Sequence, residues 1–196
     1  MILYKYRNLA NLKRLLEIII DKKLYAPRYK ELNDPMEGYF TYTKDVYPYR
    51  KEINSLKEEA LICSFAKSNL IGMMWIMYAD EGKGCCLELE IEKNTWESID
   101  VDYSPQIPKI DDPSKVDMKN LFGYKSSVWE YEQEVRYIKR SKKRLKLPIH
   151  VKKIYQGYEF NASSNEYKFY KALFEKYSVY VELIDKNKID FGYLKS

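Results

Sequence analysis

Hydrophobic and polar positions along the chain predict short strands mixed with helices. Asn8 is expected to cap a helix that ends near Lys23, because leucine and isoleucine recur there at the spacing of one helix face. Further helices are predicted over residues 49–59, 69–78 and 165–177, with a weaker helical pattern over 113–124. Strands are predicted over residues 2–6, 24–27, 60–65, 84–91, 100–103, 129–136, 149–158 and 179–184. This irregular order of strands and helices indicates an α+β fold.

The chain of 196 residues is expected to form one domain, residues 1–196, with a core that needs no disulfide or metal. Hydrophobic residues at 45% and charged residues at 32% are ordinary for a globular protein and argue against extensive disorder. We therefore predict a single α+β domain with mixed or antiparallel sheets and flanking helices. No signal peptide and no apolar run of the roughly 20 residues that cross a bilayer is visible, so we expect a cytoplasmic protein without membrane contact.

The cysteines and the single histidine restrict the available chemistry. Cys63, Cys85 and Cys86 are too few and wrongly spaced for a zinc site, and His150 alone cannot complete one, so no metal site is expected. All three cysteines fall in strand-like apolar segments, where reduced core thiols are the usual case. One histidine also argues against Ser-His-Asp or Cys-His catalysis. Any chemistry must therefore use Glu, Lys, Arg, Tyr and Ser.

An acidic segment over residues 129–136 is the most informative stretch of the chain. If it is a strand, Glu132, Glu134 and Arg136 project from one face, because strand side chains alternate with a period of two. The guanidinium can hold one carboxylate ionised, while repulsion between like charges raises the affinity of the other for a proton. The same pattern also fits a solvated strand on which Arg136 is only an ion-pair partner.

Two further features of composition suit a ligand with phosphates and planar rings. Residues 139–146 form a basic run that could contact phosphates, or could equally be a solvated hairpin or loop. The 20 tyrosines suit half-buried strands and also supply surfaces on which planar ligands stack.

Residues 104–114, with three prolines, form the longest irregular connection, which is typical either of a binding lid or of a simple insertion.

Five motifs in this order resemble the bacterial and phage-associated domain-of-unknown-function family 2971. They are Leu3-Tyr4-Lys5-Tyr6-Arg7, Asn33-Asp34-Pro35-Met36-Glu37-Gly38, Cys63-Ser64-Phe65, the segment 74–84 and Trp129-Glu130-Tyr131-Glu132-Gln133-Glu134-Val135-Arg136. The resemblance covers nearly the whole chain. Members of that family are widespread in prokaryotic genomes and sometimes lie near defence functions, which implies a toxin or phage-defence effector.

The order of parts is also similar to the ADP-ribosyltransferase superfamily, in which a first strand holds NAD, a central strand carries Ser or Tyr, and a late strand carries a catalytic Glu. The corresponding residues here are Lys5 and Arg7, then Ser64, then Glu132 and Glu134. The resemblance implies an ADP-ribosyltransferase-like fold. Two departures are that Lys5 stands where many members have His, and that Ser64 lacks a Ser-Thr-Ser context.

The resemblance implies a metal-free reaction on NAD, with a protein or nucleic acid as the acceptor of the transferred group. Glu134 is the expected catalytic residue, since the second Glu is the usual one in that superfamily, and Glu132 would bind the ribose or the acceptor. Arg7 suits the pyrophosphate better than Lys5 does, because its fork of donors matches phosphate oxygens. The aromatic rings proposed for stacking on nicotinamide are Tyr6, Tyr25, Trp75 and Tyr78.

Each of these residues also has a plain structural interpretation. Lys5 and Arg7 could be the solvent face of a strand, and Ser64 a satisfied core hydroxyl. Trp75 and Tyr78 lie at helical spacing among methionines, a pattern typical of a core. Asn33-Asp34-Pro35 consists of the usual turn formers.

Two other functions remain open from the sequence. A non-catalytic module could bind a nucleotide or single-stranded nucleic acid through the basic run and the tyrosines. A phosphodiester-cleaving enzyme could gather a divalent metal on Glu132, Glu134 and acids near Asp111.

Overall fold

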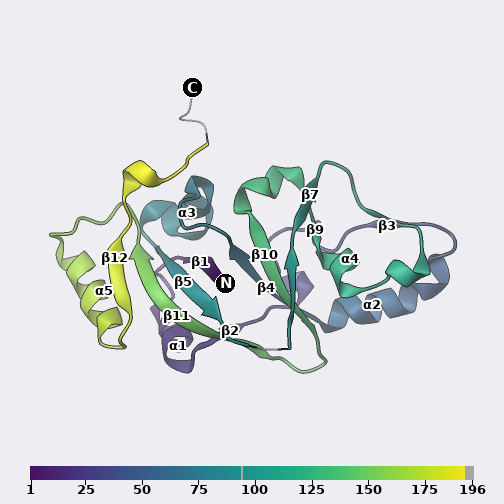
Figure 1. Cartoon of the computed structure of the whole chain (residues 1–196), viewed down its shortest axis with the longest axis horizontal. Coiled ribbons are helices and arrows are strands. Elements are labelled where there is room, and N and C mark those ends of the chain that lie inside the picture. The colour runs from purple at the N-terminus through teal and green to yellow at the C-terminus, as the bar shows by residue number, and fades with distance from the viewer. Residues whose placement is uncertain (94, 193–196) are drawn as a thin grey trace. The chain divides into compact units, whose positions relative to one another are not determined.

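The chain divides into two compact units in a computed structural model that describes residues 1–93 and 95–192 (Figure 1). The first unit contains Met1–Leu24, Phe65–Lys93 and Pro148–Ser196, and the second contains Tyr25–Ser64 and Asn94–Leu147. Strands and helices occur in both units, so the α+β class is confirmed. The sheets are largely antiparallel with flanking helices, as expected.

The first unit is built on a sheet with the strand order β12-β11-β5-β1-β4, and β2 also pairs with β11. Its strands are β1 (Ile2–Arg7), β2 (Lys23–Tyr25), the end of β4 (Ala60–Ala66), β5 (Cys85–Ile91), β11 (Lys146–Gln156) and β12 (Tyr180–Leu183). All pairs with a printed register are antiparallel except β11 with β12. A parallel pair needs a crossover, and α5 (Asn165–Glu175) supplies it beside β12 (Figure 1).

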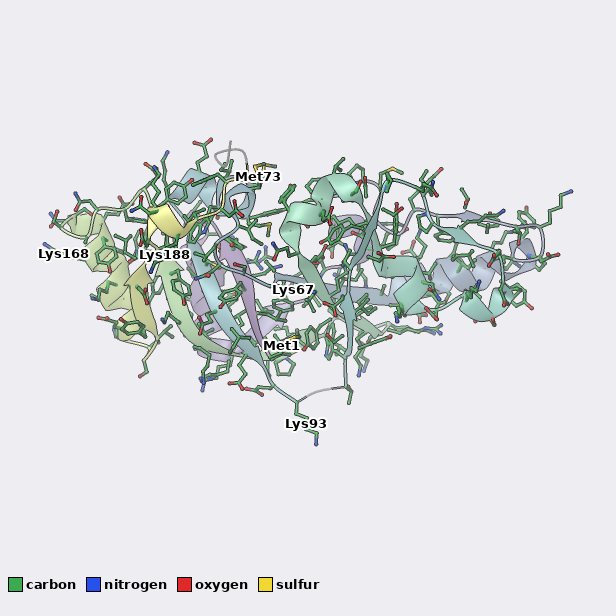
Figure 2. All side chains as sticks on the ribbon, turned by 45° about the horizontal axis from the view of Figure 1, so that its top comes forward. Met1, Lys67, Met73, Lys93, Lys168 and Lys188 are labelled. Atoms are coloured by element: carbon green, nitrogen blue, oxygen red, sulfur yellow. The ribbon has the colours of Figure 1, made fainter. Side chains whose placement is uncertain are left out.

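Four further helical elements belong to this unit. They are α1 (Leu12–Asp21), α3 (Gly72–Tyr78) and the 3-10 turns η3 (Asp80–Gly82) and η6 (Lys186–Lys188). Leu15, Ile18 and Ile19 of α1 are buried, which is the face that the leucine spacing predicts. Lys168 and Lys188, both labelled in Figure 2, are exposed lysines of this unit.

The second unit surrounds a separate apolar core. Its helices are α2 (Arg50–Glu59), α4 (Met118–Phe122) and the 3-10 elements η1 (Tyr29–Glu31), η2 (Tyr47–Tyr49), η4 (Pro113–Lys115) and η5 (Ser127–Glu132). Its strands are β3 (Thr41–Tyr42), the first part of β4, β6 (Glu97–Asp100), β7 (Asp102–Ser104), β8 (Lys109–Ile110), β9 (Tyr124–Ser126) and β10 (Glu134–Arg140). β4, β10 and β6 are neighbours in one sheet, while β3 pairs with β8 and β7 with β9 in parallel.

Several predicted boundaries are wrong, each for a visible reason. Asn11 rather than Asn8 caps α1, because its side chain accepts from the Arg14 backbone N–H at 3.1 Å. α3 begins at Gly72 rather than at residue 69, since Ile71 pairs with Asp190 as an isolated β-bridge. The predicted strand 100–103 is two strands, β6 and β7. The predicted irregular segment 104–114 contains the short strand β8.

Among the described residues, no helix is long and apolar enough to cross a membrane. The three cysteines are buried and are not joined by disulfides, as expected of core thiols. Burial raises the pKa of Cys85 to about 12, so this thiol stays protonated at neutral pH.

Candidate functional site

A cluster of charged side chains is buried inside the second unit. Its members are all less than a tenth exposed: Glu37, Lys125, Glu132, Glu134 and Arg136. Buried charges are costly unless they are paired and hydrogen-bonded, so the pairing of each member is the first question.

A turn after Asp34 brings Glu37 to the cluster. The Asp34 carboxylate accepts from the Met36 backbone N–H at 2.9 Å, and the Asp34 carbonyl accepts from the Glu37 N–H at 3.1 Å. Gly38 follows with φ +65°, and a Cβ there would lie 2.9 Å from the Phe122 ring. The turn predicted for this motif is therefore present, and it directs an acidic side chain that the sequence interpretation left without a role.

Arg136 lies at the centre of the cluster and is 1% exposed. Its Nη1 and Nη2 donate to the two oxygens of Glu37 at 2.5 and 2.8 Å. Its Nε and Nη2 donate to the two oxygens of Glu134 at 2.8 and 2.9 Å, and Nη1 also donates to the Phe122 carbonyl at 2.7 Å. The five N–H groups of the guanidinium thus have five acceptors, which is full satisfaction for a buried arginine.

Lys125 of β9 links the other carboxylates. Its ammonium lies 2.5 Å from Glu132 Oε2 and 3.4 Å from Glu134 Oε2. The same ammonium lies 4.7 Å from the centre of the Trp129 ring, within the range of a cation–π contact. Glu134 is therefore shared between the two cations of the cluster.

The prediction that residues 129–136 form one strand is wrong in its first half. Residues up to Glu132 form the 3-10 helix η5, and β10 begins only at Glu134. Gln133 between them has φ 46°, a left-handed conformation that ends the helix. Glu134 and Arg136 do lie on one face of β10, as their hydrogen bonds require, whereas Glu132 reaches Lys125 from the helix. Lys125 of β9 contacts both Trp129 and Glu132 of η5. These contacts between two elements favour the helix over the strand that the local sequence pattern predicts.

The two carboxylates that accept hydrogen bonds from Arg136 have pKa values shifted in opposite directions. Burial by itself raises the pKa of Glu134, but Arg136, Lys125 and a hydrogen bond with Ser64 outweigh it and hold the pKa at about 2. Burial also raises the pKa of Glu37, and there Arg136 offsets the rise only in part while the charge of Glu134 adds to it. Arg136 therefore holds Glu134 ionised, and the acid with the raised proton affinity is Glu37.

The cluster has one more acid than base. Three carboxylates face one ammonium and one guanidinium, so with every group ionised the net charge is −1. A buried surplus of negative charge favours either a bound proton or a nearby positive charge. The raised pKa of Glu37 is consistent with a bound proton. Attraction for a nearby positive charge is the property that a reaction with a developing cation would use.

Two hydroxyl groups lie against Glu134. Ser64, on strand β4, hydrogen-bonds its side chain, and the Tyr103 hydroxyl accepts from its backbone N–H at 2.7 Å. Burial raises the pKa of Tyr103, so this hydroxyl is neutral at neutral pH. The resemblance to the ADP-ribosyltransferases pairs a central-strand serine with a late-strand glutamate, and these two residues do meet.

The remaining predicted cofactor residues lie mostly in the first unit. Tyr6 and Trp75 are buried and pack edge to face at 5.2 Å, and the Trp75 Nε1 donates to the Asn69 carbonyl at 2.8 Å. Lys5 lies 5.7 Å over the Phe65 ring. Tyr78, the last residue of α3, is half-buried.

Arg7 lies opposite Cys85, and Tyr25 lies next to Arg144. Arg7, also half-buried, stands directly opposite Cys85 in the pairing of β1 with β5. Tyr25, at the start of the second unit, lies 5.5 Å beneath the Arg144 guanidinium.

Sequence reasoning missed Glu37, Lys125 and Tyr103. Glu37 stands in a motif that the family resemblance singles out, and its acidic side chain after a turn was an available signal. Lys125 and Tyr103 stand in segments without any distinguishing pattern. Their roles depend on which strands become neighbours.

No group of three or more His, Cys, Asp or Glu side chains that could hold a metal ion occurs within residues 1–93 and 95–192. Asp111, considered as a possible metal ligand, is exposed and paired with Lys115 at 2.8 Å. The resulting hydrogen bond lowers the pKa of Asp111.

No family model matches the chain, and a search of the curated proteins and of the solved structures finds no significant match either. The two resemblances described above therefore rest on their motifs and on the residues that carry them.

Proposed function

We propose that the chain is an NAD-using, ADP-ribosyltransferase-like protein in which Glu134 is the catalytic carboxylate. The observation that carries the proposal is the environment of this one side chain. Glu134 has a pKa of about 2, hydrogen-bonds Ser64, and belongs to a cluster with a surplus negative charge. A carboxylate held ionised in this way suits a reaction in which positive charge develops on the substrate.

The chemistry follows from the charge of the transition state. Breaking the bond between nicotinamide and ribose develops positive charge on the sugar, and a fixed carboxylate stabilises that charge. Because its pKa is about 2, Glu134 acts at neutral pH as a permanent negative charge and not as a proton carrier. Any proton released by the acceptor goes elsewhere, and Glu37, whose pKa burial raises, is the carboxylate better suited to take it.

The proposal requires access to a residue that is 4% exposed. The 3-10 helix η5 supplies both Glu132 and the Trp129 ring that covers the Lys125 ammonium. Short 3-10 segments have weaker hydrogen-bond geometry than α-helices. We therefore propose that η5 moves when substrate enters.

The test is a calorimetric titration with NAD combined with an assay for released nicotinamide. Glu134→Gln keeps the shape of the side chain and removes its charge, so NAD binding is expected to persist while turnover falls by a factor of 100 or more. Glu182→Gln, which removes an exposed carboxylate paired with Lys153, is the matched control and should leave both readouts unchanged.

Full nicotinamide release by Glu134→Gln contradicts the assignment of Glu134. An absence of both heat and turnover for the unaltered protein contradicts the proposal as a whole. Glu134→Gln also removes one ion-pair partner of the buried Arg136 and could therefore unfold the protein. Circular dichroism of each variant distinguishes loss of fold from loss of catalysis.

A further inference from the structure

An open hollow on the second unit is lined by two tyrosines, a threonine and a lysine. Tyr42, Thr43, Lys44 and Tyr47 surround a volume of about 200 Å³. Tyr42 and Tyr47 are 42% and 52% exposed, so both side chains are accessible to a ligand.

The rings form a connected aromatic surface. Tyr42 and Tyr47 have centroids 6.2 Å apart with planes inclined by 34°, and the Phe40 ring lies 6.0 Å from the Tyr42 ring. The Arg50 guanidinium lies 4.6 Å from the centre of the Tyr47 ring. Rings with exposed faces and a stacked guanidinium are the surfaces on which nucleobases stack.

The backbone holds this hollow in one shape. The Thr43 carbonyl accepts from the backbone N–H groups of both Val46 and Tyr47 at 3.2 Å, and Val46 is fully buried. On the other side, the Thr41 and Thr43 N–H groups donate to the carbonyls of Pro108 and Ile110 at 2.9 and 3.2 Å. Little ordering of the loop is therefore needed when a ligand binds.

Positive charge is available at this hollow. Lys44, Arg50 and Lys51 are exposed, and none of them makes an ion pair within the part of the chain that the structure describes. Asp45 and Glu52 are the acids of the same stretch, so residues 41–52 carry a net charge of +1 from three cations and two anions.

The basic run over residues 139–146 is different, because acids already neutralise part of it. Arg140 pairs with Glu59 at 2.7 Å, and Arg144 pairs with Glu31 at 2.6 Å. Arg28 in turn donates to the carbonyls of Ser141 and Lys142, which fixes the turn of the run. Phosphates would have to compete with these contacts, whereas the cations beside Tyr42 and Tyr47 face no such competition.

We propose that the hollow lined by Tyr42, Thr43, Lys44 and Tyr47 is a nucleotide-binding site, which stacks a base on the two tyrosines and holds the phosphate on Lys44 and Arg50. The ligand is a nucleotide unit, either free or within a single strand of nucleic acid. This inference does not rest on the function proposed for Glu134, since it uses none of the residues of the buried cluster.

The test measures fluorescence anisotropy with a labelled oligothymidylate and calorimetry with thymidine monophosphate, both at low salt. Tyr42→Ala and Tyr47→Ala are each expected to weaken binding about tenfold, since stacking of one base on an aromatic ring has roughly that effect. Lys44→Ala is expected to flatten the slope of log affinity against log salt by about 0.7. Binding of the mononucleotide assigns a free nucleotide, and binding of the oligonucleotide alone assigns a nucleic-acid strand.

Tyr180→Ala is the matched control, because Tyr180 is at least as exposed as Tyr42 and Tyr47 and has a lysine, Lys153, 5.2 Å from its ring. Binding by this variant should equal that of the unaltered protein. The proposal is overturned if neither probe binds at low salt. It is also overturned if Tyr42→Ala and Tyr47→Ala bind normally while Lys142→Ala with Lys143→Ala abolishes binding, since the basic run would then be the site.

Discussion

Arg136 and Glu37, 99 positions apart in the chain, are joined by two hydrogen bonds of 2.5 and 2.8 Å in the interior of the second unit. This contact links two motifs that look unrelated along the sequence, the turn that follows Asp34 and the strand β10. Glu134 completes the arrangement from the same strand as Arg136. A change in any of the three therefore leaves a buried charge without its partner.

Replacing Arg136 with Met is expected to lower the free energy of unfolding by about 3–5 kcal/mol, because Glu37 and Glu134 then remain buried without their guanidinium. Urea denaturation followed by circular dichroism measures the loss. Arg140→Ala is the control, since Arg140 is half exposed in its pair with Glu59 and such pairs contribute about 0–1 kcal/mol. Equal losses for the two variants would show that the buried network adds no stability.

The stability of the protein is expected to fall in acid partly because of Glu134. Its pKa is about 2 in the folded protein against 4.5 for the free carboxyl. A depressed pKa provides stability that is fully present above about pH 4.5 and is lost as the pH falls toward 2. Unfolding free energies at pH 7, 4.5, 3 and 2 should therefore decrease more for the unaltered protein than for Glu134→Gln.

Parallel pH curves for those two proteins would contradict the low pKa of Glu134. Other carboxylates, including Glu31 with its Arg144 partner, contribute to the acid response of both proteins. The difference between the curves removes the contribution of Glu31, which is present in each, and reports Glu134 together with its effect on the pKa of Glu37.

Replacing Gly82 with Ala is expected to destabilise the first unit by about 2–4 kcal/mol, from backbone strain together with overpacking. Gly82 has φ +88°, and an added Cβ would lie 2.4 Å from the Tyr158 ring. That ring contacts Trp75 and Phe191 edge to face, so it has little room to move. Thermal unfolding of the variant measures the effect.

Gly192→Ala is the matched control for this position. Gly192 also has a positive φ, of +72°, but nothing lies within 4 Å of an added Cβ. Only the backbone strain of about 1 kcal/mol is expected there. A loss as large as that of Gly82→Ala would mean that strain, and not the Tyr158 ring, decides both effects.

Gln156→Met is expected to raise the free energy of unfolding by about 1–2 kcal/mol. Gln156 is 0% exposed, and neither its Oε1 nor its Nε2 has a hydrogen-bond partner within the described part of the chain. An unsatisfied buried amide is costly, and methionine has a similar shape without polar donors. Gln106→Met, at an exposed position, should change stability by less than about 0.5 kcal/mol. A loss of stability in Gln156→Met would reveal a partner for the amide, such as an ordered water.

The spacing of apolar residues predicted an element correctly where the residues that are buried lie within that element. The helix α2 was expected over residues 49–59 and spans Arg50–Glu59, and the buried strand β4 was expected over 60–65 and spans Ala60–Ala66. In both cases the spacing of apolar residues agrees with the burial that the fold imposes. Residues 129–132 were predicted as a strand and form a 3-10 helix, because they contact Lys125, which lies outside that segment.

The sequence by itself determined the α+β class, most of the strands and helices, the buried cysteines and the placement of Glu134 and Arg136 on one face of a strand. Only the tertiary structure decided that Glu37 and Lys125 join that pair, that the acid with the raised pKa is Glu37, and that Tyr42 and Tyr47 line one hollow. The reason is physical. Periodicity reports which face of an element is buried, whereas a charge network depends on which elements become neighbours, and that is settled by packing across long separations in the chain.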